Sequence, residues 1–215
     1  MSLLEAWNNS IYRDTARTPE PFHGTTTVGV KVREGVVLAA DKRATAGHLI
    51  ASRTVKKIVK ITDNVAMTIA GVVADAQSLA DTVKAEMEYY SISSKVKPRV
   101  RNYANLLARI LFSSKWFPYI VQLIVGGYDD SPRLYTLDWY GSILEEDTFT
   151  STGSGSPIAL GVLEEGYNEN MNIEEAVELA KKAVRAATRR DSASGDGVDV
   201  LIITRDGSRE LTIKF

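Results

Sequence analysis

Thr25, which follows Gly24, is the residue whose surroundings in the sequence best suit catalysis. A threonine hydroxyl is a weak nucleophile and needs a base beside it. If the chain is cut before Thr25, this residue gains a free α-amine, whose pKa of about 7.7–8.0 leaves a neutral fraction to accept the hydroxyl proton. One residue then supplies both nucleophile and base. The chemistry that we predict is attack of a threonine on a carbonyl, without a histidine.

Lys57 and Asp41 are the charged residues that could assist such a threonine. Alternation along the segment TVKKIVKI places Lys57 on the same face as the apolar Val55 and Val59, and Lys56 on the opposite face. An ammonium on an apolar face needs a carboxylate, and Asp41, at the end of a predicted strand, is the candidate. A cation near the threonine α-amine would lower the pKa of that amine and keep it neutral. From spacing alone, a purely structural ion pair is favoured over a catalytic one.

The composition excludes several other kinds of site. The chain has no cysteine, which rules out disulfides, thiolate nucleophiles and zinc–thiolate centres. Its two histidines, His23 and His48, leave little for a histidine-rich metal centre, and a Ser-His-Asp triad through His48 remains a minor alternative. The sequence contains no Walker phosphate loop, dinucleotide fingerprint, G-x-S-x-G elbow or H-E-x-x-H motif. We therefore expect neither a cofactor nor a metal.

Length and charge indicate a single neutral domain. The 215 residues include 26 basic and 27 acidic side chains, for a net charge of -1. This length fits one domain with a sizeable core. The balanced charge offers no field that would attract nucleic acid or an anionic membrane, and no apolar run approaches the roughly 20 residues of a membrane span. We expect neither nucleic acid nor a membrane as a partner.

The elements that must position these residues alternate between groups of strands and pairs of helices. Val28 and Val30 alternate with polar or small residues, which is typical of a half-buried strand, while Asn172 and Glu175 form a helix capping box. Hairpins dominate over βαβ units, so an α+β fold of two largely antiparallel sheets between two helix layers would use every apolar face. We expect strands at about 25–33, 36–41, 54–61, 65–71, 119–129, 133–141, 142–150, 198–204 and 209–215, a loop at 42–52, and helices at about 74–90, 99–113, from 157, and at 172–190.

The first 24 residues differ in character from the rest of the chain. They have neither the basic start nor the apolar stretch of a secretory signal, and their acidic residues argue against a transit peptide. Taken alone, the segment is as compatible with a flexible tail or the remnant of a tag as with a functional segment.

Several motifs, in order and with matching spacings from residue 25 to 215, closely resemble the catalytic β-subunits of the 20S proteasome in their archaeal form. The motifs are HGTTTVG (23–29), AADKRAT (39–45), RTVKKI (53–58), AGVVAD (70–75), TGSGS (152–156) and RDSASGDG (190–197). The resemblance implies the four-layer αββα sandwich of N-terminal nucleophile hydrolases.

The resemblance also assigns roles to individual residues. Thr25 matches the N-terminal nucleophile, and residues 1–24 match a propeptide that autolysis removes at Gly24-Thr25, leaving 25–215 as one catalytic domain. Asp41 and Lys57 match the acid and lysine of the core triad, and Gly71 matches the glycine whose N–H forms the oxyanion hole. Three residues match the groups that hold the threonine amine and hydroxyl; they are Ser154, Asp191 and Ser194. The residues that match the substrate-binding groups are Thr45, for pairing with an extended substrate strand, and Ala44, Val55, Val59, Ile69, Val73 and Gln77, for the primary specificity pocket.

The function that the resemblance implies is a threonine-type endopeptidase, synthesised as a zymogen, that degrades unfolded polypeptides in a cytoplasmic 20S particle. Its expected partners are homo- or hetero-oligomeric seven-membered β-rings, α-subunit rings, and a regulatory ATPase acting through the α-rings. Two alternatives stay open. One is a non-catalytic or partner-dependent structural β-subunit of the same particle, and the other is a small self-compartmentalised bacterial protease of the same fold.

Overall fold

The computed structural model describes residues 24–46 and 48–214. The expected propeptide therefore lies outside the described residues, apart from Gly24. The strands are β1 (Thr27–Val32), β2 (Gly35–Asp41), β3 (Ala44–Ala46), β4 (Leu49–Ser52), β5 (Ile58–Thr62), β6 (Val65–Gly71), β7 (Val121–Tyr128), β8 (Pro132–Leu137), β9 (Ile143–Glu145), β10 (Phe149–Thr152), β11 (Val198–Thr204) and β12 (Gly207–Ile213). The helices are α2 (Val73–Ser94), α3 (Val100–Ser113), α4 (Ser156–Gly166) and α5 (Ile173–Thr188).

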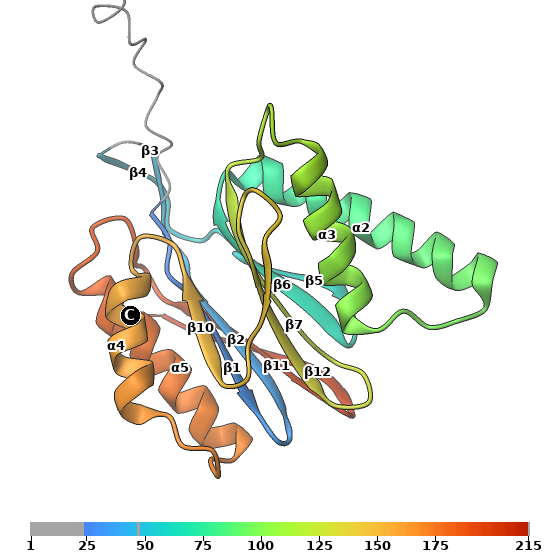
Figure 1. The fold of residues 1–215 in the computed structure, drawn as a ribbon. Helices are drawn as coiled ribbons and strands as arrows, with labels where there is room; N and C mark the ends of the chain where they lie inside the picture. The colour runs from blue at the N-terminus through green and yellow to red at the C-terminus, as the bar shows by residue number, and fades with distance from the viewer. Residues whose placement is uncertain (1–23, 47, 215) are drawn as a thin grey trace, which may run out of the picture.

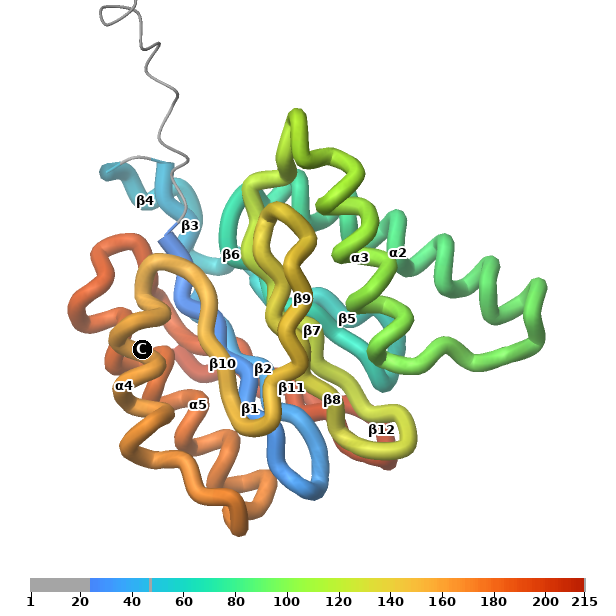
Figure 2. The backbone as a smooth tube through the Cα atoms, in the orientation of Figure 1, coloured from blue at the N-terminus to red at the C-terminus, as the bar shows by residue number. Residues whose placement is uncertain are grey.

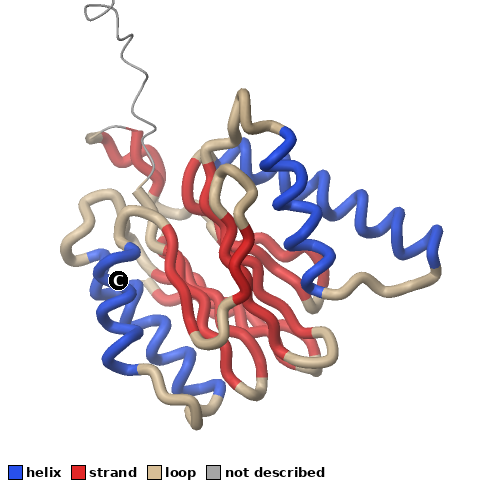
Figure 3. The backbone as a smooth tube through the Cα atoms, viewed as in Figure 1, coloured by secondary structure: helices blue, strands red, loops and turns tan. Residues whose placement is uncertain are grey.

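Two five-stranded antiparallel sheets form the centre of the molecule, with strand orders β10-β1-β2-β11-β12 and β5-β6-β7-β8-β9. The sheets lie between two helix pairs, α2 and α3 outside one sheet and α4 and α5 outside the other (Figures 1 and 3). This arrangement confirms the predicted α+β fold with four layers. None of the helices in the described part of the chain is long and apolar enough to cross a bilayer.

Strand β2 shows how the layers are held together, because all seven of its residues are buried. Its side chains alternate between two apolar clusters: Val37 and Ala39 pack with the α4–α5 layer, while Val36 and Leu38 pack between the two sheets. The continuous apolar run that ends at Asp41 is therefore explained by burial on both faces. The strand carries the Asp41 carboxylate to the end of the sheet where β1 begins.

The described helices begin within one residue of their predicted starts, as α5 illustrates, although α2 continues to Ser94 beyond its predicted end at 90. The Asn172 side chain accepts a hydrogen bond from the Glu175 N–H, and the Glu175 carboxylate accepts one from the Asn172 N–H. This is the expected capping box.

Four segment predictions differ from the structure. The strand expected at 133–141 ends at Leu137, because residues 138–141 form a turn. The other three lie where the chain crosses between layers. Residues 142–150 form not one strand but two, β9 and β10, which belong to different sheets (Figure 2). The expected loop at 42–52 contains the β3–β4 hairpin, which projects beyond both sheets near the start of β1 (Figure 1). The strand expected at 54–61 begins only at Ile58. Before it, the Val55 N–H donates to the Lys42 carbonyl in a loop, and only the Lys57 carbonyl already accepts from β6, at Ile69.

Candidate active site

Thr25 lies at the entrance to β1 with only 4% of its surface exposed. Its hydroxyl donates to the carbonyl oxygen of Gly24 at 2.7 Å, and its N–H donates to the Ser154 Oγ at 3.2 Å. The Gly24–Thr25 bond is intact, so the Thr25 nitrogen is an amide here. The predicted nucleophile is thus in contact with the carbonyl that an autolytic cleavage would attack.

Asp41 is fully buried and receives four hydrogen bonds. Its Oδ1 accepts from the Thr26 N–H at 2.9 Å and from the Lys57 Nζ at 2.8 Å. Its Oδ2 accepts from the N–H groups of Arg43 at 3.0 Å and Gly195 at 2.9 Å. A carboxylate with this many donors is held in one orientation.

Lys57 is buried immediately before β5, whereas its neighbour Lys56 is exposed. Besides its ion pair with Asp41, the Lys57 ammonium donates to the Gly24 carbonyl oxygen at 3.4 Å. Burial lowers the pKa of Lys57 below its ordinary value, and the charge of Asp41 opposes that change. The expected pairing of Lys57 with Asp41 is present, and it brings a cation to the carbonyl oxygen of the Gly24–Thr25 peptide bond.

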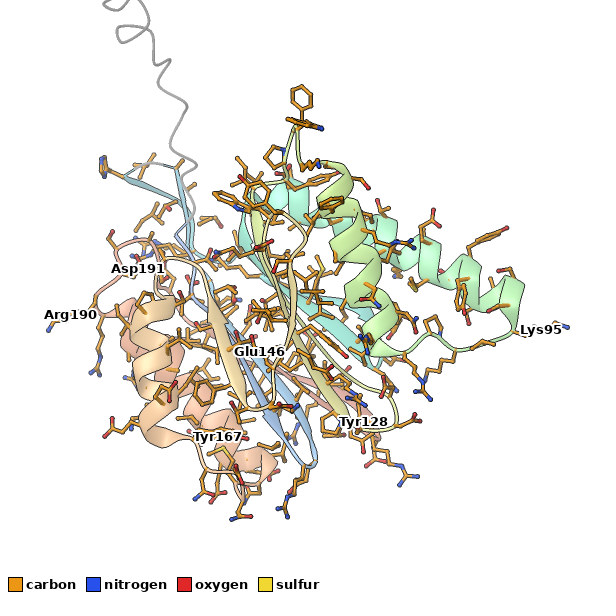
Figure 4. All side chains as sticks on the ribbon, viewed as in Figure 1. Lys95, Tyr128, Glu146, Tyr167, Arg190 and Asp191 are labelled. Carbon is orange, nitrogen blue, oxygen red and sulfur yellow. The ribbon has the colours of Figure 1, made fainter. Side chains whose placement is uncertain are left out.

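A hydroxyl–carboxylate network lies on the other side of Thr25. Asp191, in the loop between α5 and β11 (Figure 4), accepts from the Ser154 Oγ and the Ser194 Oγ, both at 2.6 Å on its Oδ2. The Ser194 hydroxyl also contacts the Thr26 Oγ1 at 2.8 Å. The three residues that the resemblance assigned to this role are therefore in one connected network that touches both Thr25 and Thr26.

Gly71 ends β6 with a φ of +129°, a conformation that side chains rarely adopt. A Cβ at this position would lie 2.1 Å from the Ile120 carbonyl oxygen. The position therefore requires glycine, which fits a backbone donor that closely approaches a reacting group.

The predicted substrate-binding residues come from β3, β5, β6, α2 and the segment before β5. Ala44 and Thr45 lie on β3, half-buried, and Gln77 is exposed on α2. Ile69 is almost fully buried and belongs, with Val59, to the apolar cluster beneath α2 and α3. The remaining predicted residues, Val55 and Val73, are half-buried.

Asp196 is a residue of this region that sequence reasoning missed. It accepts from the Arg43 Nε at 2.8 Å and from the Arg53 Nη1 at 2.6 Å. The hydrogen bond from Arg43 is the main cause that holds the pKa of Asp196 below its ordinary value. These ion pairs join both ends of the β3–β4 hairpin to the loop that carries Asp191. The sequence offered one indication of these ion pairs. Asp196 lies between two glycines, and an arginine lies at each end of the segment that forms the hairpin.

No group of three or more metal-ligating side chains occurs within residues 24–46 and 48–214. The groups that the fold brings together are instead a hydroxyl, an ammonium, carboxylates and a backbone turn, which suit acyl transfer to a threonine.

Comparison with known proteins places this geometry in context. Residues 21–203 match the family model described as "Proteasome subunit". The chain is 61% identical over 192 residues to "Proteasome subunit beta 2" of Aeropyrum pernix, which covers 89% of this chain and 87% of the relative. It is 56% identical over 184 residues to "Proteasome subunit beta 2" of Ignicoccus hospitalis, covering 86% of each chain. It is 53% identical over 192 residues to "Proteasome subunit beta" of Archaeoglobus profundus, covering 89% of each chain.

Proposed function

The chain belongs to the proteasome subunit family, as an archaeal-type β subunit of the 20S core, and on this premise we propose that it is an active threonine endopeptidase once residues 1–24 are removed. The observation that carries the proposal is the convergence on one carbonyl oxygen. The Thr25 hydroxyl and the Lys57 ammonium both contact the oxygen of Gly24, with Asp41 behind the lysine.

The first event is cleavage of the chain's own Gly24–Thr25 bond. The Thr25 Oγ bonds to the Gly24 carbonyl carbon, the C–N bond breaks, and the nitrogen leaves as an amine. Water then hydrolyses the resulting ester, which yields the Gly24 carboxylate and restores the hydroxyl. An amide nitrogen cannot accept the hydroxyl proton in this event. Lys57 contacts the Gly24 carbonyl and burial lowers its pKa, so in its neutral form it is suited to take the proton from the Thr25 Oγ and to pass it to the leaving nitrogen.

Substrate cleavage repeats these steps with the new α-amine as the base. The amine accepts the Thr25 hydroxyl proton as Oγ attacks the substrate carbonyl, and the Gly71 N–H binds the oxyanion. The proton passes to the leaving amine, and water releases the acyl group. Ser154, Asp191 and Ser194 hold the Thr25 nitrogen and its strand in position throughout.

The assembly that we propose consists of seven-membered β-rings between α-subunit rings in the cytoplasm, supplied with unfolded polypeptides by a regulatory ATPase. Four of the relatives carry the numbered name "beta 2", and a relative in Saccharolobus islandicus is named "beta 1". Such numbering favours one second candidate, a β subunit that is active only beside a paralogue.

Co-expression of this chain with α subunits distinguishes the two candidates. We expect assembled particles of this chain and α subunits alone to hydrolyse fluorogenic peptides and to react with a covalent threonine-directed probe. Labelling that appears only after a paralogous β subunit is added would support the partner-dependent role. No labelling under either condition would contradict the proposed activity.

Gly24→Ala is expected to slow removal of the first 24 residues. A Cβ at residue 24 would lie 1.5 Å from the Ala193 Cβ and 2.5 Å from its Cα, so the loop that carries Asp191 and Ser194 must move. Overpacking of this kind costs about 1–3 kcal/mol, or about 5- to 150-fold in rate. Intact-mass measurement over time gives the processed fraction. The control is Gly161→Ala, where an added Cβ meets nothing within 4 Å; equal processing of the two variants would contradict the prediction.

Cleavage after uncharged, mostly apolar residues is the second expectation. The proposed specificity pocket has Gln77 as its only polar side chain among aliphatic residues, so an unpaired charge buried there is costly. Hydrophobic complementarity discriminates weakly, by about 1–3 kcal/mol per methylene, so the preference should be broad. The measurement compares fluorogenic peptides that differ only in the residue before the cleaved bond. Fastest cleavage after glutamate or arginine would disprove this pocket assignment.

A further inference from the structure

A cleft of about 350 Å³ adjoins the proposed active site but contains none of the predicted specificity-pocket residues. It lies beside Gly71 and Ser154, the residues assigned to the oxyanion and to the threonine nitrogen. The other side chains that shape it are Ala70, Ile120, Val121, Gln122 and Trp139. This volume is at the lower end of the range for ligand sites and suits one or two side chains.

Strand order places this cleft and the specificity pocket on opposite sides of the reacting carbonyl. In one sheet, Gly71 ends β6, the pocket residue Val59 lies on the neighbouring β5, and the cleft is built from β7 on the other side. In the other sheet, Thr25 lies just before β1. Thr45 comes after β2, the neighbour of β1 on one side, and Ser154 comes after β10, its neighbour on the opposite side. Both sheets therefore give the same order, with the acyl part of a substrate toward β2 and β5 and the cleft toward β7 and β10.

The lining of the cleft is apolar, with one polar edge and no charged side chain. Trp139 is 44% exposed, so its ring has surface left to bury against an incoming group. It is fixed in a tight turn, in which the Asp138 carboxylate accepts from the N–H of Tyr140 at 2.9 Å. Gln122 forms the polar edge, where its Oε1 accepts from the Gly153 N–H at 3.1 Å. A charged side chain would find no partner here and would lose hydration.

We propose that this cleft binds the residue immediately after the cleaved bond and that Trp139 makes it selective for apolar and aromatic side chains. The inference rests on the proposed peptidase activity, because it concerns the part of the substrate that leaves with the amine. It adds a second specificity determinant, independent of the pocket on the acyl side.

The test uses assembled particles and internally quenched peptides that share one acyl sequence and differ only in the residue after the cleaved bond. We expect kcat/KM for phenylalanine or leucine to exceed that for glycine or aspartate by about tenfold, the size of a modest hydrophobic discrimination. Trp139→Ala should reduce this ratio to near one. The matched control is Trp116→Ala, because Trp116 is 82% exposed and lines no part of the cleft, and it should leave the ratio unchanged.

A second variant keeps the proposal testable if Trp139→Ala fails to assemble. Gln122→Glu retains an acceptor for the Gly153 N–H and adds a negative charge, so it should raise cleavage before lysine relative to cleavage before aspartate several-fold. Labelling of Thr25 by a covalent probe, which has no leaving residue, should proceed normally in both variants. If Thr25 is labelled normally but the native particle shows no preference for the residue after the cleaved bond, the proposed subsite is wrong and the peptidase activity stands. The same conclusion follows if a preference exists but neither variant changes it. Failure of the native particle to label or cleave would overturn the peptidase activity on which it rests.

Discussion

Replacement of Thr25 with alanine is expected to abolish both peptide hydrolysis and removal of residues 1–24. In the proposed mechanism, the same hydroxyl attacks the Gly24 carbonyl, whose oxygen it already contacts, and later the substrate carbonyl. Loss of a covalent nucleophile removes the reaction path altogether, so the activity should fall by at least about 10³-fold. Intact-mass analysis of assembled particles reports processing, and fluorogenic peptides report hydrolysis.

Thr25→Ser is the control for this substitution. It keeps a hydroxyl in the same place, so these particles should still mature and cleave peptides, although more slowly. An alanine variant that loses its first 24 residues as the native chain does would show that another nucleophile, or another protease, performs the cleavage.

Lys57→Ala is expected to inactivate the particle, whereas Lys56→Ala should leave activity close to native. Only Lys57 is buried against Asp41 and the Gly24 carbonyl; Lys56 is 74% exposed, and its nearest partner is Glu210 at 3.6 Å. Loss of the ammonium leaves the Asp41 carboxylate buried without its cation, which costs about 3–5 kcal/mol. Hydrolysis rates of the two variants, compared at equal particle concentration, check this expectation. Comparable losses in both would mean that the buried lysine has no special role.

A double variant separates catalysis from folding. Asp41→Asn with Lys57→Met removes both charges, so no charge is left unpaired in the interior. We expect its particles to assemble more readily than those of Lys57→Ala and yet remain inactive. Recovery of activity together with assembly would indicate that the Lys57–Asp41 pair is only structural.

Local sequence patterns predicted the elements that are buried on a regular face. Alternation placed Lys57 inside and Lys56 outside, and a turn followed by a continuous apolar run identified the strand that delivers Asp41. The same patterns failed at residues 142–150, where the chain passes from β9 in one sheet to β10 in the other. Nothing in a short window distinguishes a long strand from two short ones in different sheets, because the partner strands are remote in sequence.

The network around Thr25 was less accessible to local reasoning. Ser154 and Ser194 occur in glycine- and serine-rich segments that resemble ordinary surface loops, and only family resemblance distinguished them. Their role depends on Asp191, which accepts from both hydroxyls across 37 and 3 residues of sequence. Asp196 was not identified at all, since its two arginines are brought to it by the β3–β4 hairpin, which the sequence did not predict.

Tandem mass spectrometry of assembled particles after treatment with a covalent threonine-directed probe tests the central claim most directly. We predict a β chain that begins at Thr25 and carries the probe on that residue. A chain that retains the Gly24–Thr25 bond, or a processed chain whose Thr25 stays unmodified, would contradict the account.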